Sequence, residues 1–157
     1  MKSNPEKIVN DFLQVAALAG ESLSVEDILI EELGAPHQPT GLPIGSMAVY
    51  VFSCKGTTLK VGKAGANSDA RFRSQHYNPK SAASTLAASI LKDPSPIGNP
   101  SLDLDSVGNW IKKNTDRTNY ILKSEIGIEV LTLLESYLQC LLKPVYEGFA
   151  SQRKSSA

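Results

Sequence analysis

Cationic side chains are concentrated in the middle of the chain, where they can bind phosphate groups. Residues 46–80 carry six lysines and arginines against the single carboxylate of Asp69, a net charge of +5. The six are Lys55, Lys60, Lys63, Arg71, Arg73 and Lys80. Ammonium and guanidinium groups hold nucleic-acid phosphates largely through charge, so such binding weakens as salt rises. The segment is therefore a candidate phosphate-binding surface.

The beginning of the chain has the opposite charge. Residues 1–45 hold two lysines against seven acidic side chains, a net charge of −5, and the whole 157-residue chain has a formal net charge of zero. Two interpretations stay open. The acidic start either neutralises the basic middle within the fold, or the basic middle serves an anionic partner.

The N-terminal part of the chain is predicted to be helical. Apolar residues follow helical spacing from residue 5 onward, and Gly20 interrupts the pattern. Ser24 and Asp27 are typical of a helix start, so a second helix is expected over Val25–Leu33. The segment 34–45, which contains three prolines, is expected to be a loop.

A β-hairpin is predicted next, followed by alternating helices and strands. The hairpin strands are 47–53 (MAVYVFS) and 57–61 (TTLKV), joined by a Lys-Gly turn. Helices are expected from Ala70 to about His76, over Ser81–Lys92, over Val107–Asn114 and over Ile128–Leu142, with a strand over Asn119–Lys123.

These elements predict a small α+β domain with a three-stranded antiparallel sheet flanked by helices. The expected organisation is an added N-terminal helical segment (1–45), a central domain (46–149) and a flexible tail (150–157). No apolar run approaches the length of a membrane span, and the polar start lacks the order of a secretory signal, so a cytoplasmic protein is expected. Cys54 and Cys140 lie outside any metal-ligand cluster, so a zinc site is not predicted.

The hairpin and the elements after it resemble the GIY-YIG nuclease family. The strings Ala48-Val49-Tyr50 and Lys60-Val61-Gly62 stand where that family has its two short strand motifs. Arg71 follows the glycine at the family's spacing on the next helix, and His76 comes about one turn later. Glu135 lies on the last helix and is followed by Pro144 and Tyr146, as in the family's ending. The resemblance covers about residues 46–148.

The resemblance implies a metal-dependent endonuclease that hydrolyses DNA phosphodiester bonds. Tyr50 would act as the base or position the attacking water, Arg71 would contact the phosphate, and Glu135 would hold Mg²⁺ or Mn²⁺. Lys60 would lower the pKa of Tyr50 or neutralise phosphate, and His76 would relay a proton or bind phosphate. Lys55, Lys63, Arg73 and Lys80 would bind flanking phosphates.

The chain departs from the family pattern at three positions. Ala48 replaces a glycine, Lys60 replaces the second tyrosine, as in some restriction-enzyme-like members, and Glu147 replaces an asparagine. A catalytically inactive nucleic-acid-binding module on the same fold is therefore the alternative, and an unrelated interaction domain is a third interpretation. The protein is expected to be a monomer or a homodimer.

Two ring side chains, those of Trp110 and His37, lie outside the motifs. Trp110, which is close in sequence to Lys112, Lys113 and Arg117, would either stack on a base or pack in the core. His37 lies in the proline-containing loop and is assigned no role.

Overall fold

A four-stranded antiparallel sheet forms the centre of the protein. The computed structural model describes residues 4–82 and 84–146. The strand order is β1-β4-β2-β3, so that β1 and β3 form the two edges. The strands are β1 (Ile28–Leu33), β2 (Ser46–Cys54), β3 (Thr57–Ala64) and β4 (Asp116–Lys123).

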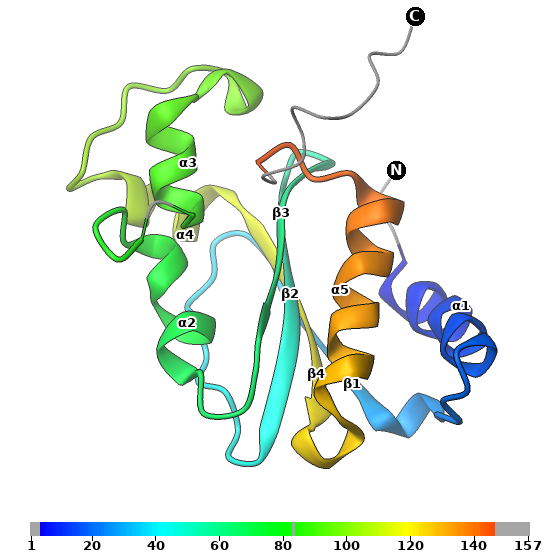
Figure 1. Cartoon of the computed structure of the whole chain (residues 1–157). Helices are drawn as coiled ribbons and strands as arrows, with labels where there is room; N and C mark the ends of the chain where they lie inside the picture. Colours follow the sequence, from blue (N-terminus) through cyan, green and yellow to red (C-terminus); the bar gives the residue numbers. More distant parts are fainter. Residues whose placement is uncertain (1–3, 83, 147–157) are drawn as a thin grey trace, which may run out of the picture.

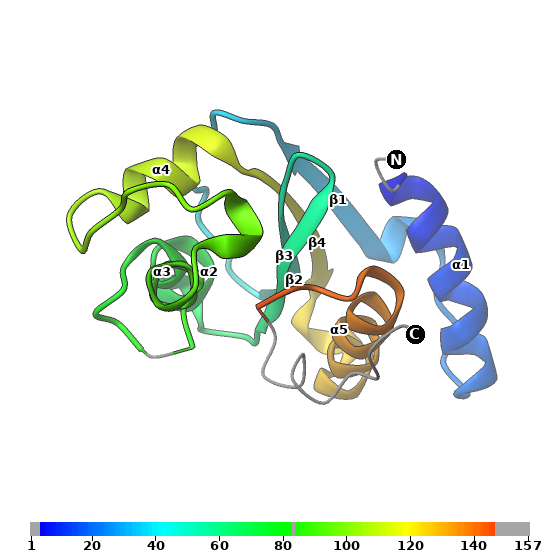
Figure 2. The ribbon, with the colours of Figure 1, turned by 90° about the horizontal axis from the view of Figure 1, so that it is seen from above.

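Helices cover both faces of the sheet (Figures 1 and 2). On one face lie α1 (Pro5–Leu18) and α5 (Ile128–Leu142). On the other lie α2 (Asp69–Arg73), α3 (Leu86–Lys92) and α4 (Val107–Asn114). Two separate hydrophobic cores result, one on each side of the sheet. An α+β fold with a small sheet between helices was predicted, and this architecture is confirmed.

The alternation of side chains along β2 divides its residues between the two cores. Met47, Val49 and Val51 face α1 and α5, whereas Tyr50 and Phe52 face α2, α3 and α4. Every second side chain of a strand points to the same face, so the central strand is buried on both sides. Tyr50 is consequently a core residue of the layer that contains α2.

The prediction of three strands and of a helix over Val25–Leu33 is wrong. Ser24 and Asp27 do form a cap, in which the Ser24 backbone N–H donates to Asp27 Oδ2 at 2.8 Å. Only a single 3₁₀ turn follows this cap. Ile28 then begins strand β1, which pairs antiparallel with β4. The partner strand lies about ninety positions later in the chain, so local spacing did not reveal the pairing. The sheet therefore takes one strand from residues 1–45, which were expected to be helical.

The remaining elements agree with the prediction, apart from their ends. The hairpin, the helix Val107–Asn114 and the helix Ile128–Leu142 are confirmed. Helix α3 begins at Leu86 rather than Ser81, because the Thr85 hydroxyl caps it by accepting from the Ala88 N–H at 3.1 Å. Glu147 and the predicted tail 150–157 lie outside the described residues. No helix in the described part of the chain has the length and apolar character needed to cross a membrane.

Candidate active site

Tyr50 lies at the centre of the candidate site, between the two neighbouring strands. It is opposite Gly62 on β3 and opposite Asn119 on β4. Its side chain is fully buried. A Cβ atom placed on Gly62 would lie only 2.6 Å from Tyr50 Oη, so the ring extends over the space that a side chain at position 62 would fill. The glycine thus lets the phenol reach toward the edge of the sheet.

His76 holds the Tyr50 hydroxyl in a defined orientation. Its Nε2 atom lies 2.5 Å from Tyr50 Oη. Its Nδ1 atom accepts a hydrogen bond from the Leu86 backbone N–H at 3.1 Å, so Nδ1 carries no proton. The proton of a neutral imidazole must then lie on Nε2, which donates to the phenol oxygen. Tyr50 Oη is therefore an acceptor toward His76.

Burial and nearby cations keep His76 neutral. Burial lowers its pKa to about 3, and the positive charges of Lys60, Arg71 and Arg117 act in the same direction. A proton relay through a charged imidazolium is thus unavailable near neutral pH. His76 instead acts as a fixed hydrogen-bond donor, a role that its sequence position alone did not distinguish.

The pKa of Tyr50 reflects two opposing influences. Burial is the largest influence, and the pKa of Tyr50 lies above its ordinary value. The charge of Arg71, a hydrogen bond from Arg71 and the charge of Arg117 lower this pKa, while the charge of Glu135 raises it. The cations and the hydrogen bond from His76 favour the ionised phenol, so the residues around Tyr50 oppose the effect of burial.

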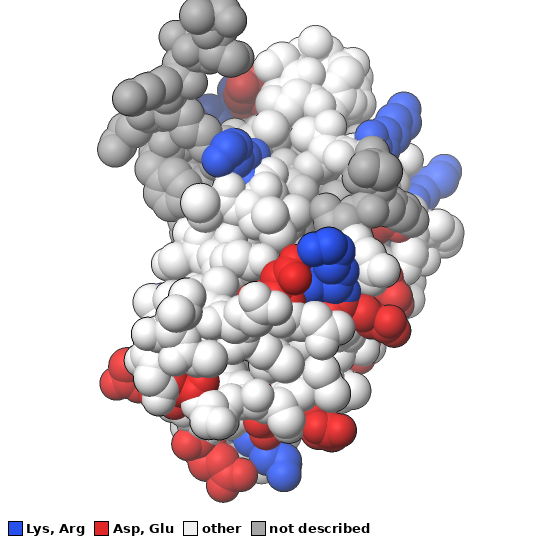
Figure 3. All heavy atoms as spheres, turned by 90° about the vertical axis from the view of Figure 1, so that its right-hand side faces the viewer, with Lys and Arg blue, Asp and Glu red and all other residues white. Residues whose placement is uncertain are grey.

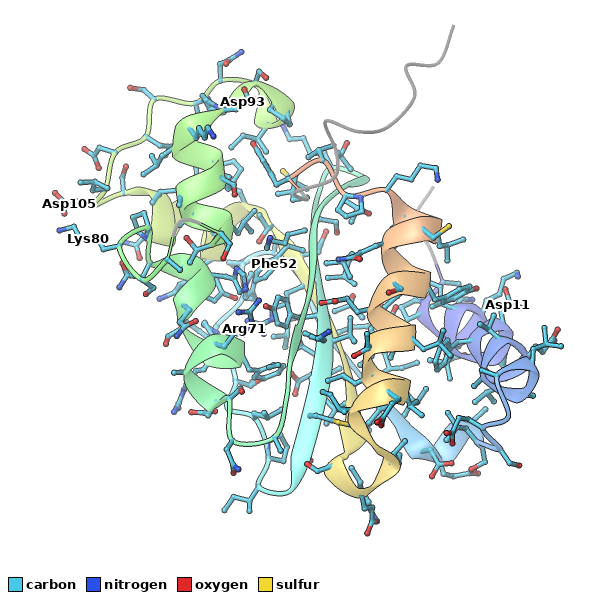
Figure 4. All side chains as sticks on the ribbon, viewed as in Figure 1. Asp11, Phe52, Arg71, Lys80, Asp93 and Asp105 are labelled. Atoms are coloured by element: carbon cyan, nitrogen blue, oxygen red, sulfur yellow. The ribbon has the colours of Figure 1, made fainter. Side chains whose placement is uncertain are left out.

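Arg71 reaches the sheet from α2. Its Nε donates to the Lys63 backbone carbonyl oxygen at 2.9 Å, which fixes the guanidinium beside the β3 edge. Figure 4 shows Arg71 between α2 and the sheet. Its charge is also close enough to lower the pKa of both Tyr50 and His76. The side chain lies where a phosphate next to Tyr50 could be bound through its remaining N–H groups.

Glu135 approaches the same edge from the opposite face of the sheet. It projects from α5, and its side chain is 18% exposed. Lys63 Nζ lies 3.5 Å from Glu135 Oε1 and 3.2 Å from Thr132 Oγ1. Arg71 binds the backbone carbonyl of Lys63, and Glu135 pairs with the Lys63 ammonium group. The side chains of Arg71 and Glu135 therefore both contact Lys63 on edge strand β3.

Lys60 lies two residues before Gly62 on the same strand and is only 8% exposed. It is paired with Phe52, so its side chain leaves the sheet on the Tyr50 face. Its charge lowers the pKa of His76. The second motif position thus supplies a buried cation to the Tyr50–His76 pair.

The other predicted phosphate contacts are scattered. Lys55 occupies the hairpin turn, roughly 20 Å along β3 from Gly62 at the usual strand rise. Lys80 lies far from the sheet, at the outer side of the α2 and α3 layer (Figure 4). Arg73 lies 3.9 Å from the Asp69 carboxylate and lines a shallow hollow with Lys112 and Tyr77. Of the four flanking residues, only Lys63 joins the central group.

On the α1 side, the visible Lys and Arg side chains of the described residues do not form one continuous basic patch (Figure 3). Figure 3 looks onto that side and shows isolated Lys and Arg side chains among uncharged and acidic ones. The functional groups described above instead meet at the β3 edge, between α2 and α5.

Arg117 is a functional candidate that the sequence did not indicate. The prediction grouped it with Trp110 and the lysines of the helix before it, but it is buried at 1% exposure. Its carbon Cζ lies over three aromatic rings, at 5.2 Å from the Tyr50 centroid, 5.0 Å from Phe52 and 4.6 Å from Phe72. Strand β4 begins at Asp116, three residues before the predicted start at Asn119. In a strand that begins there, Arg117, Asn119 and Ile121 share one face, and this alternation in the sequence could have indicated that Arg117 points into the fold.

Trp110 itself packs against the core of the α2 layer, which favours the packing interpretation. His37, to which no role was assigned, is buried there too. Its Nδ1 donates to the Thr115 carbonyl oxygen at 2.8 Å, and its Nε2 accepts from the Tyr77 hydroxyl at 2.8 Å. Its place is therefore structural.

Glu135 is the one carboxylate that the described residues bring to this group. Within residues 4–82 and 84–146 no cluster of three or more His, Cys, Asp or Glu side chains could hold a metal ion. A single carboxylate fits Mg²⁺ or Mn²⁺, because such hard ions often keep several waters and take further oxygen ligands from a bound phosphate. It does not fit a fully enclosed structural site.

Comparison of the chain with models of protein families, with curated proteins and with solved structures gave no match.

Proposed function

We propose that the protein is a metal-dependent endonuclease of the GIY-YIG type that hydrolyses DNA phosphodiester bonds. The observation that carries the proposal is the convergence of Tyr50, Arg71 and Glu135 at one strand edge. The three come from β2, α2 and α5, separated by 21 and 64 positions in the chain. The order and spacing of the sequence motifs point to the same three residues.

Each residue of the group has a chemical role in the proposed reaction. Arg71 binds the phosphate and stays charged throughout. Tyr50, in its ionised form, takes a proton from water, while the His76 N–H holds its oxygen in place. The water oxygen bonds to phosphorus as the bond from phosphorus to the leaving oxygen breaks, and the leaving oxygen takes a proton from solvent. Glu135 would hold a divalent metal ion, which when bound stabilises negative charge on the phosphate.

Incubation with supercoiled plasmid DNA and Mg²⁺ or Mn²⁺ tests the proposal. Nicking by the wild-type protein is expected, and Glu135→Gln and Tyr50→Phe should each abolish it in protein that circular dichroism shows to be folded. Arg73→Met is the matched control, because Arg73 lies on the same helix as Arg71 but its guanidinium is near the Asp69 carboxylate. Absence of metal-dependent nicking across a range of salt and pH would refute the catalytic proposal.

A non-catalytic DNA-binding module is the second candidate. It is favoured by the pairing of Lys63 with Glu135, because an ammonium group engages the carboxylate that a metal ion would need. In that case the protein should bind duplex DNA without cleaving it, and Glu135→Gln should not weaken binding. Gel-shift and nicking assays on the same preparations separate the two functions.

A further inference from the structure

The buried guanidinium of Arg117 lies directly behind the candidate site. Arg117 is on β4, opposite Phe52, and Asn119 is opposite Tyr50. Three hydrogen bonds fix its orientation. Nε donates to Asn119 Oδ1 at 2.8 Å, Nη1 to the Tyr77 hydroxyl at 3.1 Å, and Nη2 to the Phe72 carbonyl oxygen at 2.5 Å. Its donor directions are thus set by groups on three different elements.

Among the contacts that the structure gives Arg117, none is with a carboxylate. The nearest acidic group in the network is Glu31 on β1, whose Oε1 accepts from Asn119 Nδ2 at 2.8 Å and from the Thr40 hydroxyl at 2.7 Å. Burying a charge that is neutralised only through an intervening amide is costly, because the charge loses its hydration. Stability alone does not account for a cation here, since an apolar side chain would fill the core at lower cost.

The position of the charge relative to Tyr50 suggests its purpose. The guanidinium lies over the Tyr50 ring, and its charge lowers the pKa of both Tyr50 and His76. We propose that Arg117 is a positioning residue for Tyr50, a permanent buried cation that stabilises the ionised phenol and keeps its partner His76 neutral.

The purpose of this arrangement rests on the proposed nuclease function, but the effect on Tyr50 does not. The charged groups that act on Tyr50 and His76 come from four elements, while α3 contributes only the Leu86 backbone N–H. The charged groups are Arg117 on β4, Arg71 on α2, Lys60 on β3 and Glu135 on α5, and the two partners also act on each other. Arg117 is the cation buried deepest among them, so its charge is the least screened by solvent.

Titration of the residue at position 50, in protein without DNA or metal, tests the proposal. A multiply fluorinated tyrosine introduced at this position has a more acidic phenol, and its ¹⁹F resonance reports ionisation within the pH range where the protein is folded. Arg117→Met should lower the ionisation constant roughly tenfold, as expected for the loss of one charge at this distance. Arg117→Lys, which keeps the charge, should restore most of the difference, and Arg73→Met should leave the constant unchanged.

An unchanged ionisation constant in folded Arg117→Met overturns the proposal. If near-ultraviolet circular dichroism shows that this variant is not folded, Glu31→Gln decides instead. This nearly isosteric change removes the balancing negative charge, so the ionisation constant should rise, and the absence of a rise overturns the proposal. A purely structural role for Arg117 predicts no such pair of opposite shifts.

The pH dependence of nicking then connects the charge to activity. In Arg117→Met the ascending limb of the rate profile should move to higher pH, whereas Arg117→Lys should stay near wild type. Failure to nick DNA at all would remove the proposed function without affecting the NMR result. The two proposals therefore fail separately.

Discussion

The phenol ring of Tyr50 occupies the space directly over Gly62 on the neighbouring strand. A Cβ atom at position 62 would lie 2.6 Å from Tyr50 Oη and 2.7 Å from the ring carbons Cε2 and Cζ. The backbone of Gly62 has no positive φ, so the requirement for glycine comes from this close approach and not from backbone conformation. The position of the Tyr50 ring therefore requires a glycine at position 62.

Gly62→Ala should displace the Tyr50 ring, weaken its contact with His76 and abolish nicking. Forcing an extra methyl group into a packed site typically costs about 1–3 kcal/mol, so the free energy of unfolding should fall by that amount. Chemical denaturation measures the stability, and the plasmid assay measures the activity. Gly65→Ala is the matched control, since its new methyl group would be 3.9 Å from the nearest atom, Ile128 Cδ1. Equal behaviour of the two variants would contradict the steric argument.

Elements with a repeated local pattern could be predicted from the sequence. The hairpin follows from two β-rich runs around a Lys-Gly turn, and the helix with Glu135 follows from its apolar stripe. Glu135 lies next to the buried residue Leu134 of this stripe, and its side chain is 18% exposed. These features depend on residues within a few positions of one another, which a single sequence displays directly.

Features that depend on distant partners could not be predicted. Strand β1 was missed because its pairing with β4 joins positions about ninety residues apart. The burial of Arg117 was not predicted, because a charged side chain is rarely buried and the aromatic rings and hydrogen-bond acceptors around it come from distant positions in the chain. Lys63 was predicted as a phosphate contact, while its pairing with Glu135 required knowing that α5 reaches the β3 edge.

The neutral state of His76 should make folding sensitive to acid. Its pKa is about 3 in the folded protein and near 6.5 when the chain is unfolded. Between these values the unfolded state binds the extra proton, so stability falls as pH drops from about 6.5 toward 3. The slope from this one group is at most about 1.4 kcal/mol per pH unit. His76→Gln should remove that part of the slope in denaturation curves measured from pH 4 to 7.

The remaining slope in this variant should include a contribution from His37, whose pKa burial also lowers. Denaturation curves of His37→Gln measured in parallel separate the two histidines. An identical pH dependence of wild type and His76→Gln would show that the pKa of His76 is the same in the folded and unfolded protein, against the prediction.

Arg71→Lys should reduce nicking although the charge is preserved. The guanidinium uses Nε to hold the Lys63 carbonyl oxygen, and its other nitrogens can serve both Tyr50 and a phosphate, whereas an ammonium group cannot serve all of these in fixed directions. Removing one well-placed donor to developing charge typically costs 100-fold or more in rate, so a loss of roughly that size is expected. Arg73→Lys, on the same short helix, should retain full activity. Single-turnover nicking rates at saturating protein give the comparison.

Lys63→Met should strengthen the binding of Mn²⁺ to the protein in the absence of DNA. The Lys63 ammonium lies 3.5 Å from Glu135 Oε1, so a metal ion at this carboxylate must displace an existing ion pair. Partly exposed pairs of this kind are worth about 0.2–1 kcal/mol, which corresponds to an affinity gain of up to roughly fivefold. Isothermal titration with Mn²⁺ measures the affinity of each variant.

The double-mutant cycle of wild type, Lys63→Met, Glu135→Gln and the double variant supplies the control. The gain in Mn²⁺ affinity from Lys63→Met should vanish in the Glu135→Gln background, because the ion pair between Lys63 and Glu135 does not exist there. Weaker Mn²⁺ binding by Lys63→Met would instead mean that Lys63 supports the metal site and does not compete with it.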